Sequence, residues 1–209
     1  IDAVIQVKRP GRGPSRESAG RTHRCGTVAI IGRTNVGKST LLNRLVEEKI
    51  AIVADIPQTT RHRILGVRTL PTAQVAFLDT PGIHKPRHRM NKLMVELAFQ
   101  AASEADVVGL VVDGAEGIGP GDLFLFRRIA SRPPEQKALL ILNKTDRMKR
   151  DDLLPLIASA SKQGRFDEIV PVSALTGENC DRLLDVIVTL LPEGEPAWPA
   201  DTLTDQPGR

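Results

Sequence analysis

The sequence predicts an α/β fold, in which helices cover both faces of a six-stranded, mostly parallel sheet with one antiparallel strand near an edge. Two observations predict this three-layer sandwich. Short, uninterrupted runs of Val, Ile and Leu recur along the chain, as is typical of strands buried on both faces of a parallel sheet. Segments with helical patterning lie between these runs, and such alternation favours helix layers on both sides of one sheet.

The elements can be placed in order along the chain. Strands are predicted at residues 28–31, 64–70, 75–78, 107–112, 138–142 and 169–172. Helices are predicted at residues 39–46, 91–103, 121–131, 151–161 and 179–191. Gly66 interrupts the second strand and indicates a bulge or a twist point there. The last helix carries leucines and Ile187 at spacings of three and four, which predicts one buried stripe.

Composition indicates one domain with an extension at each end. The chain has 209 residues, of which 41% are hydrophobic but only 3% aromatic, so aliphatic side chains must fill the core. Residues 1–24 contain six basic and two acidic side chains, which equals the net charge of +4, so the rest is neutral. This Gly/Pro/Ser-rich leader is typical of a solvated, flexible tail, although a binding arm is the alternative. The folded domain is predicted at 25–192, and the proline-rich segment 193–209 is predicted to be extended.

Composition also restricts the compartment. No apolar run approaches the roughly 20 residues that a membrane-spanning helix needs. Cys25 and Cys180 form no disulfide framework, and two isolated, reduced thiols suit a cytoplasmic protein.

The octapeptide 32–39 matches G-x-x-x-x-G-K-[ST], the phosphate-binding P-loop. Gly32 and Gly37 let the backbone curl so that its N–H groups point at anionic oxygens, and the helix that follows adds its positive end. Lys38 can reach the β- and γ-phosphates, and the Ser39 hydroxyl can bind Mg²⁺. A glycine-rich turn without function is the alternative, but the strand before and the helix after favour a P-loop NTPase. The predicted nucleotide contacts of this loop are Gly32, Asn35, Val36, Gly37, Lys38, Ser39 and Thr40.

Two further segments are predicted to complete the phosphate and metal site. Asp79-Thr80-Pro81-Gly82 follows the strand 75–78, where Asp79 can hold Mg²⁺ through water and the Gly82 N–H can contact the γ-phosphate. The loop 56–61 offers a hydroxyl that would complete the Mg²⁺ shell. Thr60 is our choice and Thr59 the alternative, although an ordinary polar loop would have the same composition.

Two motifs after later strands predict that the base is guanine. Asn143-Lys144-Thr145-Asp146 follows the strand 138–142, and the Asp146 carboxylate can accept hydrogen bonds from guanine N1–H and the 2-amino group. Adenine lacks both donors, and such a loss can discriminate by about 10⁴-fold. Asn143 can tie the base to the P-loop, and the Lys144 stem can cover the ring. In Ser173-Ala174-Leu175, the Ala174 N–H can donate to guanine O6. The sequence therefore predicts a GTP- and GDP-binding protein that uses Mg²⁺.

With these motifs the chain resembles the Era family of GTPases, within a group that includes the Der and tRNA-modifying types. The resemblance rests on five motifs and covers about residues 25–192: Gly32–Ser39, Gln58–Arg63, Asp79–Gly82, Asn143–Asp146 and Ser173–Leu175. Residues 198–205 resemble the family's interdomain linker. The resemblance implies GTP hydrolysis and a role in maturation of small-subunit ribosomal RNA on the 30S subunit.

The family carries its RNA-binding site on a C-terminal KH domain that this chain does not include. RNA binding is therefore not assigned to the residues present, in agreement with their neutral charge. The resemblance further implies a monomer in the cytoplasm, with contact at the inner membrane surface as an option.

The residues expected to act in catalysis are Asn35, Lys38, Thr60 and Gly82. Ile83 occupies the position where many regulatory GTPases carry a water-orienting Gln, so water must be positioned by other means. In related GTPases an Asn at the position of Asn35 helps to bind K⁺, which would add positive charge near the transferred phosphoryl group. The alternative is that Asn35 only braces the loop.

Other functions remain open at this stage. One is a nucleotide-gated binding module with negligible hydrolysis, and another is the GTP-binding domain of a tRNA-modifying GTPase. A P-loop kinase is disfavoured by Asn143–Asp146.

Overall fold

The computed structural model describes residues 22–46, 64–78, 98–100 and 102–198. Its six strands form one sheet in the order β2-β3-β1-β4-β5-β6, in which β2 is antiparallel to β3 and every other pair is parallel. The strands are β1 Arg24–Gly32, β2 Ile64–Leu70, β3 Ala73–Leu78, β4 Val107–Asp113, β5 Lys137–Asn143 and β6 Glu168–Pro171. The helices are α1 Lys38–Val46, α3 Pro120–Ala130, the 3-10 turn η1 Thr145–Arg147, α4 Arg150–Gln163 and α5 Cys180–Leu190. The predicted fold class is confirmed.

The element boundaries differ from the prediction mainly because strands extend past their apolar runs. β1 begins at Arg24 rather than at residue 28, since its ladder with β3 starts at the pair Arg24 and Ala73. β6 ends at Pro171, which lacks an N–H but is tolerated because β6 lies at the edge of the sheet. A register shift between Ile64 and Gly66 agrees with the bulge or twist point predicted in β2.

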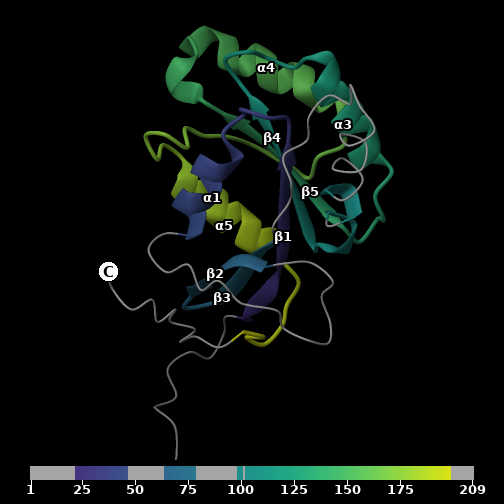
Figure 1. Cartoon of the computed structure of the whole chain (residues 1–209), viewed down its shortest axis with the longest axis vertical. Helices are drawn as coiled ribbons and strands as arrows, with labels where there is room; N and C mark the ends of the chain where they lie inside the picture. The colour runs from purple at the N-terminus through teal and green to yellow at the C-terminus, as the bar shows by residue number, and fades with distance from the viewer. Residues whose placement is uncertain (1–21, 47–63, 79–97, 101, 199–209) are drawn as a thin grey trace, which may run out of the picture.

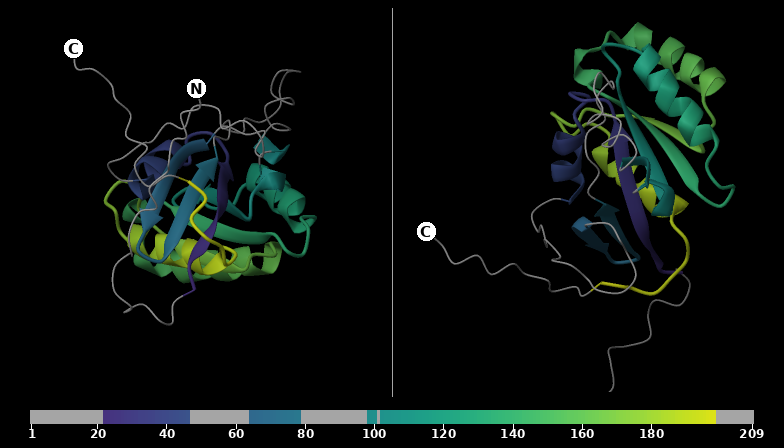
Figure 2. Two further views of the ribbon diagram at one scale, coloured as in Figure 1. Left: turned by 90° about the horizontal axis from the view of Figure 1, so that it is seen from below. Right: turned by 45° about the vertical axis from the view of Figure 1, so that its right-hand side comes forward.

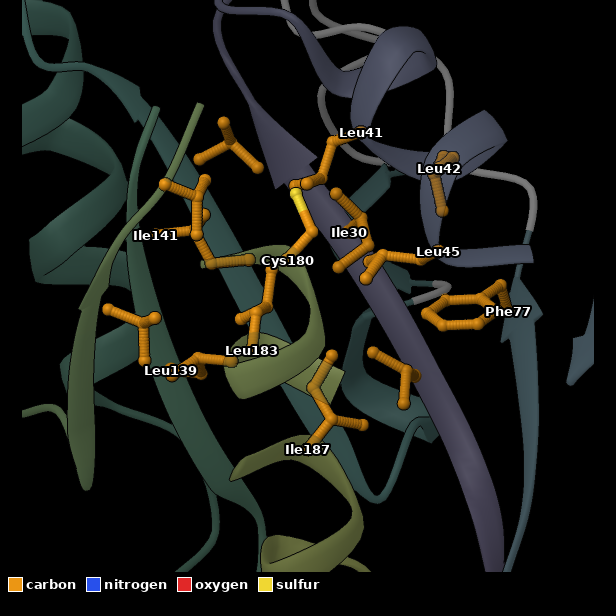
Figure 3. Close-up of a cluster of buried hydrophobic side chains, with 14 of the residues drawn as sticks. Ile30, Leu41, Leu42, Leu45, Phe77, Leu139, Ile141, Cys180, Leu183 and Ile187 are labelled. Carbon is orange, nitrogen blue, oxygen red and sulfur yellow. The ribbon is translucent and has the colours of Figure 1, made fainter. Parts of the chain in front are cut away.

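Helices cover both faces of the sheet (Figure 1), and an apolar layer is buried on each face. Alternate residues of each strand point to opposite faces, so Ile30 joins the layer under α1 and α5 while Ile31 joins the layer under α3 and α4. Helical residues 98–100 and 102–104 also cover the second face. In Figure 3, Leu41 of α1 and Leu183 of α5 approach the β1 side chain Ile30 from the first face. The central strands are thus covered on both sides, as their continuous apolar sequences require.

The topology has its switch point at the carboxyl ends of the central strands. β1 lies between β3 and β4, and the chain order reverses around it, which in open α/β sheets marks the ligand crevice. Gly32 ends β1, and the partnered residues Asp113 and Asn143 end β4 and β5 at the same edge. Figure 2 shows the helices on either side of this twisted sheet. Within the described residues, no helix is both long and apolar enough to cross a bilayer.

The opposite edge of the sheet holds the segment that leaves the last helix. Glu193 forms an isolated bridge with Arg24, and the Gly194 N–H donates to the His23 carbonyl at 3.0 Å. The buried side chain of Gln74 on β3 then contacts the backbone of Ala197 and Trp198. Residues on either side of the predicted domain limits, 23–24 and 193–194, therefore pack against each other.

Candidate nucleotide-binding site

The P-loop has a backbone that its glycines make possible. Gly32 and Gly37 adopt φ values of +156° and +95°. A Cβ at Gly32 would lie 2.5 Å from the Val111 carbonyl oxygen, and one at Gly37 would collide with the Asn143 amide nitrogen. Asn35 is left-handed at φ +64°, a conformation that Asn tolerates better than most residues. The loop therefore curls tightly over the ends of β4 and β5.

Lys38 points back across this loop. Its Nζ donates to the carbonyls of Gly32, at 3.0 Å, and Arg33, at 2.5 Å, and it has no carboxylate partner among the described residues. Burial lowers the pKa of Lys38 to about 8, because carbonyl dipoles only partly replace the water that the ammonium has lost. An anion at the loop would compensate this desolvated charge. The donor set of the site thus fits a phosphate group.

Asn143 joins three sequence motifs through one side chain. Its Nδ2 donates to the Val36 carbonyl of the P-loop at 2.8 Å, and its Oδ1 accepts the Ala174 N–H at 2.9 Å. The side chain is 2% exposed. The contact with the P-loop agrees with the expected tie between base site and phosphate site. The Ala174 N–H, expected to face guanine O6, here donates to Asn143 instead.

Asp146 is oriented by the loop after β6. The Ser173 hydroxyl donates to Asp146 Oδ1 at 2.5 Å, and the same hydroxyl oxygen accepts the Thr176 N–H at 3.1 Å. Ser173 therefore supports the carboxylate expected to read guanine and is itself completely buried. The second oxygen, Asp146 Oδ2, accepts no hydrogen bond from the described residues, so it is available to a base.

Lys144 is fixed by a residue that the sequence reasoning missed. Lys144 adopts φ +67°, and its Nζ contacts the Asn35 carbonyl at 2.7 Å and Asp113 Oδ2 at 2.5 Å. Asp113 ends β4, is 3% exposed, and also accepts the Ala115 N–H at 3.0 Å. The signal that singled out Asp79, an acidic residue at the end of a buried strand, could have found Asp113.

Arg33 ties the P-loop to the start of α3. Its Nη1 lies 3.0 Å from Asp122 Oδ2, whose side chain is fully buried and also accepts the Gly119 N–H at 2.9 Å. No local pattern links these residues, because they meet only through the packing of the loop against α3. The P-loop is thus held from outside by two cations, Arg33 and Lys144.

The structure brings most of the predicted nucleotide contacts together at this edge. They are Gly32, Asn35, Val36, Gly37, Lys38, Asn143, Lys144, Asp146, Ser173 and Ala174. Ser39 and Thr40 lie in the first turn of α1, and Leu175 is exposed on the loop after β6. Of the predicted metal ligands, only Ser39 lies within the described residues, since Thr60 and Asp79 fall outside them. The predicted γ-phosphate contact Gly82 also lies outside them, as do Thr59 and Ile83.

Residues 27–144 match the family described as 50S ribosome-binding GTPase. The chain belongs to this GTPase family. It is 45% identical to GTPase Era of Alkaliphilus metalliredigens over 188 residues, which are 90% of this chain and 63% of the relative. GTPase Era of Staphylococcus haemolyticus is also 45% identical, over 88% of this chain and 61% of the relative. The resemblance to Era is thus confirmed, and the chain spans less than two thirds of the length of these relatives.

Two solved structures support the same relationship. One is Era in complex with MgGDPNP and nucleotides 1506–1542 of 16S ribosomal RNA, with a TM-score of 0.72 and 42% identity over 88% of this chain and 63% of that chain. The other is an Aquifex aeolicus Era variant bound to GDP and AlF4−, with a TM-score of 0.71 and 42% identity over 88% of this chain and 62% of that chain.

Proposed function

We propose that this chain is the GTP-binding domain of an Era-type GTPase that binds GTP and GDP and hydrolyses GTP with Mg²⁺. The observation that carries the proposal is the position of Asn143, which hydrogen-bonds both the P-loop and the loop after β6. A phosphate motif and a base motif that share one buried side chain suit a ligand with both parts. The binding of GDP and of MgGDPNP by the Era relatives supports the same ligands here.

Each residue has a chemical task in this proposal. Lys38 holds the β- and γ-phosphates, while Asp146 accepts from guanine and selects it over adenine. Ser39, Thr60 and Asp79 would hold Mg²⁺, which when bound neutralises charge on the phosphate oxygens. The Gly82 N–H would contact the γ-phosphate and release it after hydrolysis.

We further propose that the whole protein acts in maturation of the small ribosomal subunit through its 16S ribosomal RNA. The support is the Era relative solved with a 16S ribosomal RNA segment. The chain spans about 63% of that relative, so the RNA contact belongs to the proposal for the whole protein. A monomer in the cytoplasm, with contact at the inner membrane surface, completes the proposal.

Single-turnover hydrolysis tests the enzymatic part. With protein in excess over GTP and Mg²⁺ present, we expect complete conversion to GDP, faster in KCl than in NaCl. Replacing Asn35 by Ala should remove the K⁺ effect, and equal rates in both salts for both proteins would leave Asn35 as a structural brace. Bound GTP that is never hydrolysed would favour a nucleotide-gated binding module. Displacement of GDP by an equal concentration of ATP would contradict the choice of guanine.

A further inference from the structure

We propose that Arg44 on α1 is a positioning residue for guanine specificity. This inference rests on the proposed function and assigns a role to a residue outside the nucleotide motifs. Arg44 Nε donates to the Ala174 carbonyl and Arg44 Nη2 to the Leu175 carbonyl, both at 2.9 Å. The planar guanidinium thus holds two successive peptide groups of the base-recognition loop in one fixed orientation.

The loop is shaped to accept this guanidinium. Gly177 has φ +91°, and a Cβ there would lie 2.9 Å from Arg44 Nη1. Any other residue would therefore push the guanidinium out of its position or strain the turn. The Gly177 N–H donates to the Ser173 carbonyl at 2.8 Å, which closes the turn under Arg44.

The Arg44 guanidinium influences Asp146 indirectly, through the planar peptide group between Leu175 and Thr176. The Leu175 carbonyl and the Thr176 N–H belong to one trans peptide, so they point in opposite directions. When Arg44 holds the carbonyl, the N–H is aimed at the Ser173 hydroxyl oxygen, 3.1 Å away. That hydroxyl has one proton, and it donates this proton to Asp146 Oδ1 at 2.5 Å. Arg44 therefore orients the carboxylate without touching it.

The second peptide group acts on the other side of the loop. Because Arg44 holds the Ala174 carbonyl, the Leu175 N–H in the same peptide points away from α1. The preceding N–H, that of Ala174, faces Asn143 Oδ1 at 2.9 Å. Arg44 thus fixes the N–H groups of Leu175 and Thr176, while Asn143 fixes that of Ala174.

The phosphate site has its own supports. Lys38 is held by loop carbonyls, and the outer P-loop is held by Arg33 and Lys144. Loss of the Arg44 fork should therefore loosen base recognition more than phosphate recognition. This difference separates a positioning role from general stabilisation of the domain.

The test compares GDP with inosine diphosphate. Inosine diphosphate differs from GDP only in lacking the 2-amino group, from which Asp146 is proposed to accept a hydrogen bond. Dissociation constants are measured by calorimetry for the 209-residue chain and for Arg44→Ala and Arg44→Lys. For Arg44→Ala we expect GDP affinity to fall about tenfold and inosine diphosphate affinity by less than about threefold, since one charge-assisted contact is misaligned. Arg44→Lys should lie between, because an ammonium cannot reproduce the fork.

Arg132→Ala provides the matched control. Arg132 also donates to backbone carbonyls, those of Gln136 and Arg165 at 2.8 Å and that of Ile129 at 3.4 Å, but at the amino ends of the strands, where it also pairs with Asp167 at 2.9 Å. Arg132→Ala should destabilise the fold without changing the ratio of the GDP and inosine diphosphate affinities. A double-mutant cycle with Asp146→Ala should then show that Arg44→Ala adds no further change in the ratio.

Each result has one consequence. An unchanged ratio of the GDP and inosine diphosphate affinities in Arg44→Ala, whether both affinities fall equally or neither falls, would overturn the role of Arg44. It would leave the proposed function intact. A wild-type protein that binds neither nucleotide would contradict the proposed function itself, and the role of Arg44 with it.

Discussion

The amino and carboxyl ends of the strands differ in how fully they compensate their polar side chains. At the amino ends of the strands, polar side chains are satisfied by neighbouring backbone. Asp106 Oδ2 accepts the Thr27 N–H at 2.7 Å, and Gln136 donates to the carbonyls of Ala102 and Ala105 at 2.6 Å. At the carboxyl ends, Lys38 carries a charge that only carbonyls surround among the described residues. The contacts at the amino ends stabilise the fold, whereas the ammonium at the carboxyl ends would be compensated by the phosphate of the proposed ligand.

The pKa shifts of Asp167 and Lys38 illustrate this difference, although the carboxyl ends also hold Arg33, whose pKa is raised by its hydrogen bond to Asp122. At the amino edge, burial alone would raise the pKa of Asp167. Hydrogen bonds from the Ala138 N–H and Arg132, with the charges of Arg132 and Lys137, outweigh burial and lower that pKa below its usual value. At the carboxyl edge, burial lowers the pKa of Lys38 to about 8. The fold thus stabilises the charge of Asp167 and destabilises that of Lys38. A charge that the fold destabilises is typical of functional sites.

The largest effect is expected from removal of the Lys38 ammonium at the carboxyl ends of the strands. Lys38→Ala should weaken GDP binding by about 10²- to 10³-fold, because it removes a charged donor to phosphate. It should change the free energy of unfolding of the nucleotide-free protein by less than about 1 kcal/mol, since the ammonium has no carboxylate partner among the described residues. Calorimetry and urea denaturation measure the two quantities.

Asp106→Ala is the matched change at the other edge. It leaves the Thr27 N–H without its acceptor, so we expect a loss of about 1–3 kcal/mol in the free energy of unfolding and unchanged GDP affinity. The contrast between the edges would fail if Lys38→Ala unfolded the protein or if Asp106→Ala weakened nucleotide binding comparably.

A smaller effect is expected from pH. Since the pKa of Lys38 is about 8, its ammonium loses a proton above that pH in the nucleotide-free protein. A bound phosphate would stabilise the positive charge and so keep the Lys38 side chain protonated at higher pH. GDP affinity should therefore fall as pH rises above about 8, by at most tenfold per pH unit. Lys38→Arg remains charged throughout and controls for titration of the base itself. Parallel affinity curves for the two proteins would contradict this reading of Lys38.

The sequence predicted what depends on local pattern. Continuous apolar runs located the described strands other than β2, whose run Gly66 interrupts, and the P-loop and Asn143–Asp146 located the ends of β1 and β5 where we propose that the nucleotide binds. It did not predict the contacts between Arg33 and Asp122 or between Arg44 and the loop after β6. These pairs are separated by 89 and 130 residues and meet only after packing, so no periodicity reveals them.

The smallest expected effect concerns the exit segment at the amino edge. Gln74 is 1% exposed, its Nε2 donates to the Trp198 carbonyl at 2.7 Å, and its Oε1 accepts the N–H groups of Ala197 and Trp198 at 2.9 and 2.8 Å. Gln74→Leu should release this segment, reduce the free energy of unfolding by about 1–2 kcal/mol and leave GDP affinity unchanged. Trp198 is the single tryptophan and the chain has no tyrosine, so intrinsic fluorescence reports on this residue alone.

In Gln74→Leu we expect the Trp198 emission to shift to longer wavelength and to become more accessible to acrylamide, because its backbone anchors are gone. Thr69→Val is the control, since it removes another partner of Gln74 Nε2, at 3.3 Å, and keeps the contacts with Ala197 and Trp198. Its spectrum should match that of the wild type. An unshifted emission in Gln74→Leu would mean that packing of the indole against the second apolar layer, rather than Gln74, holds the exit segment on the sheet.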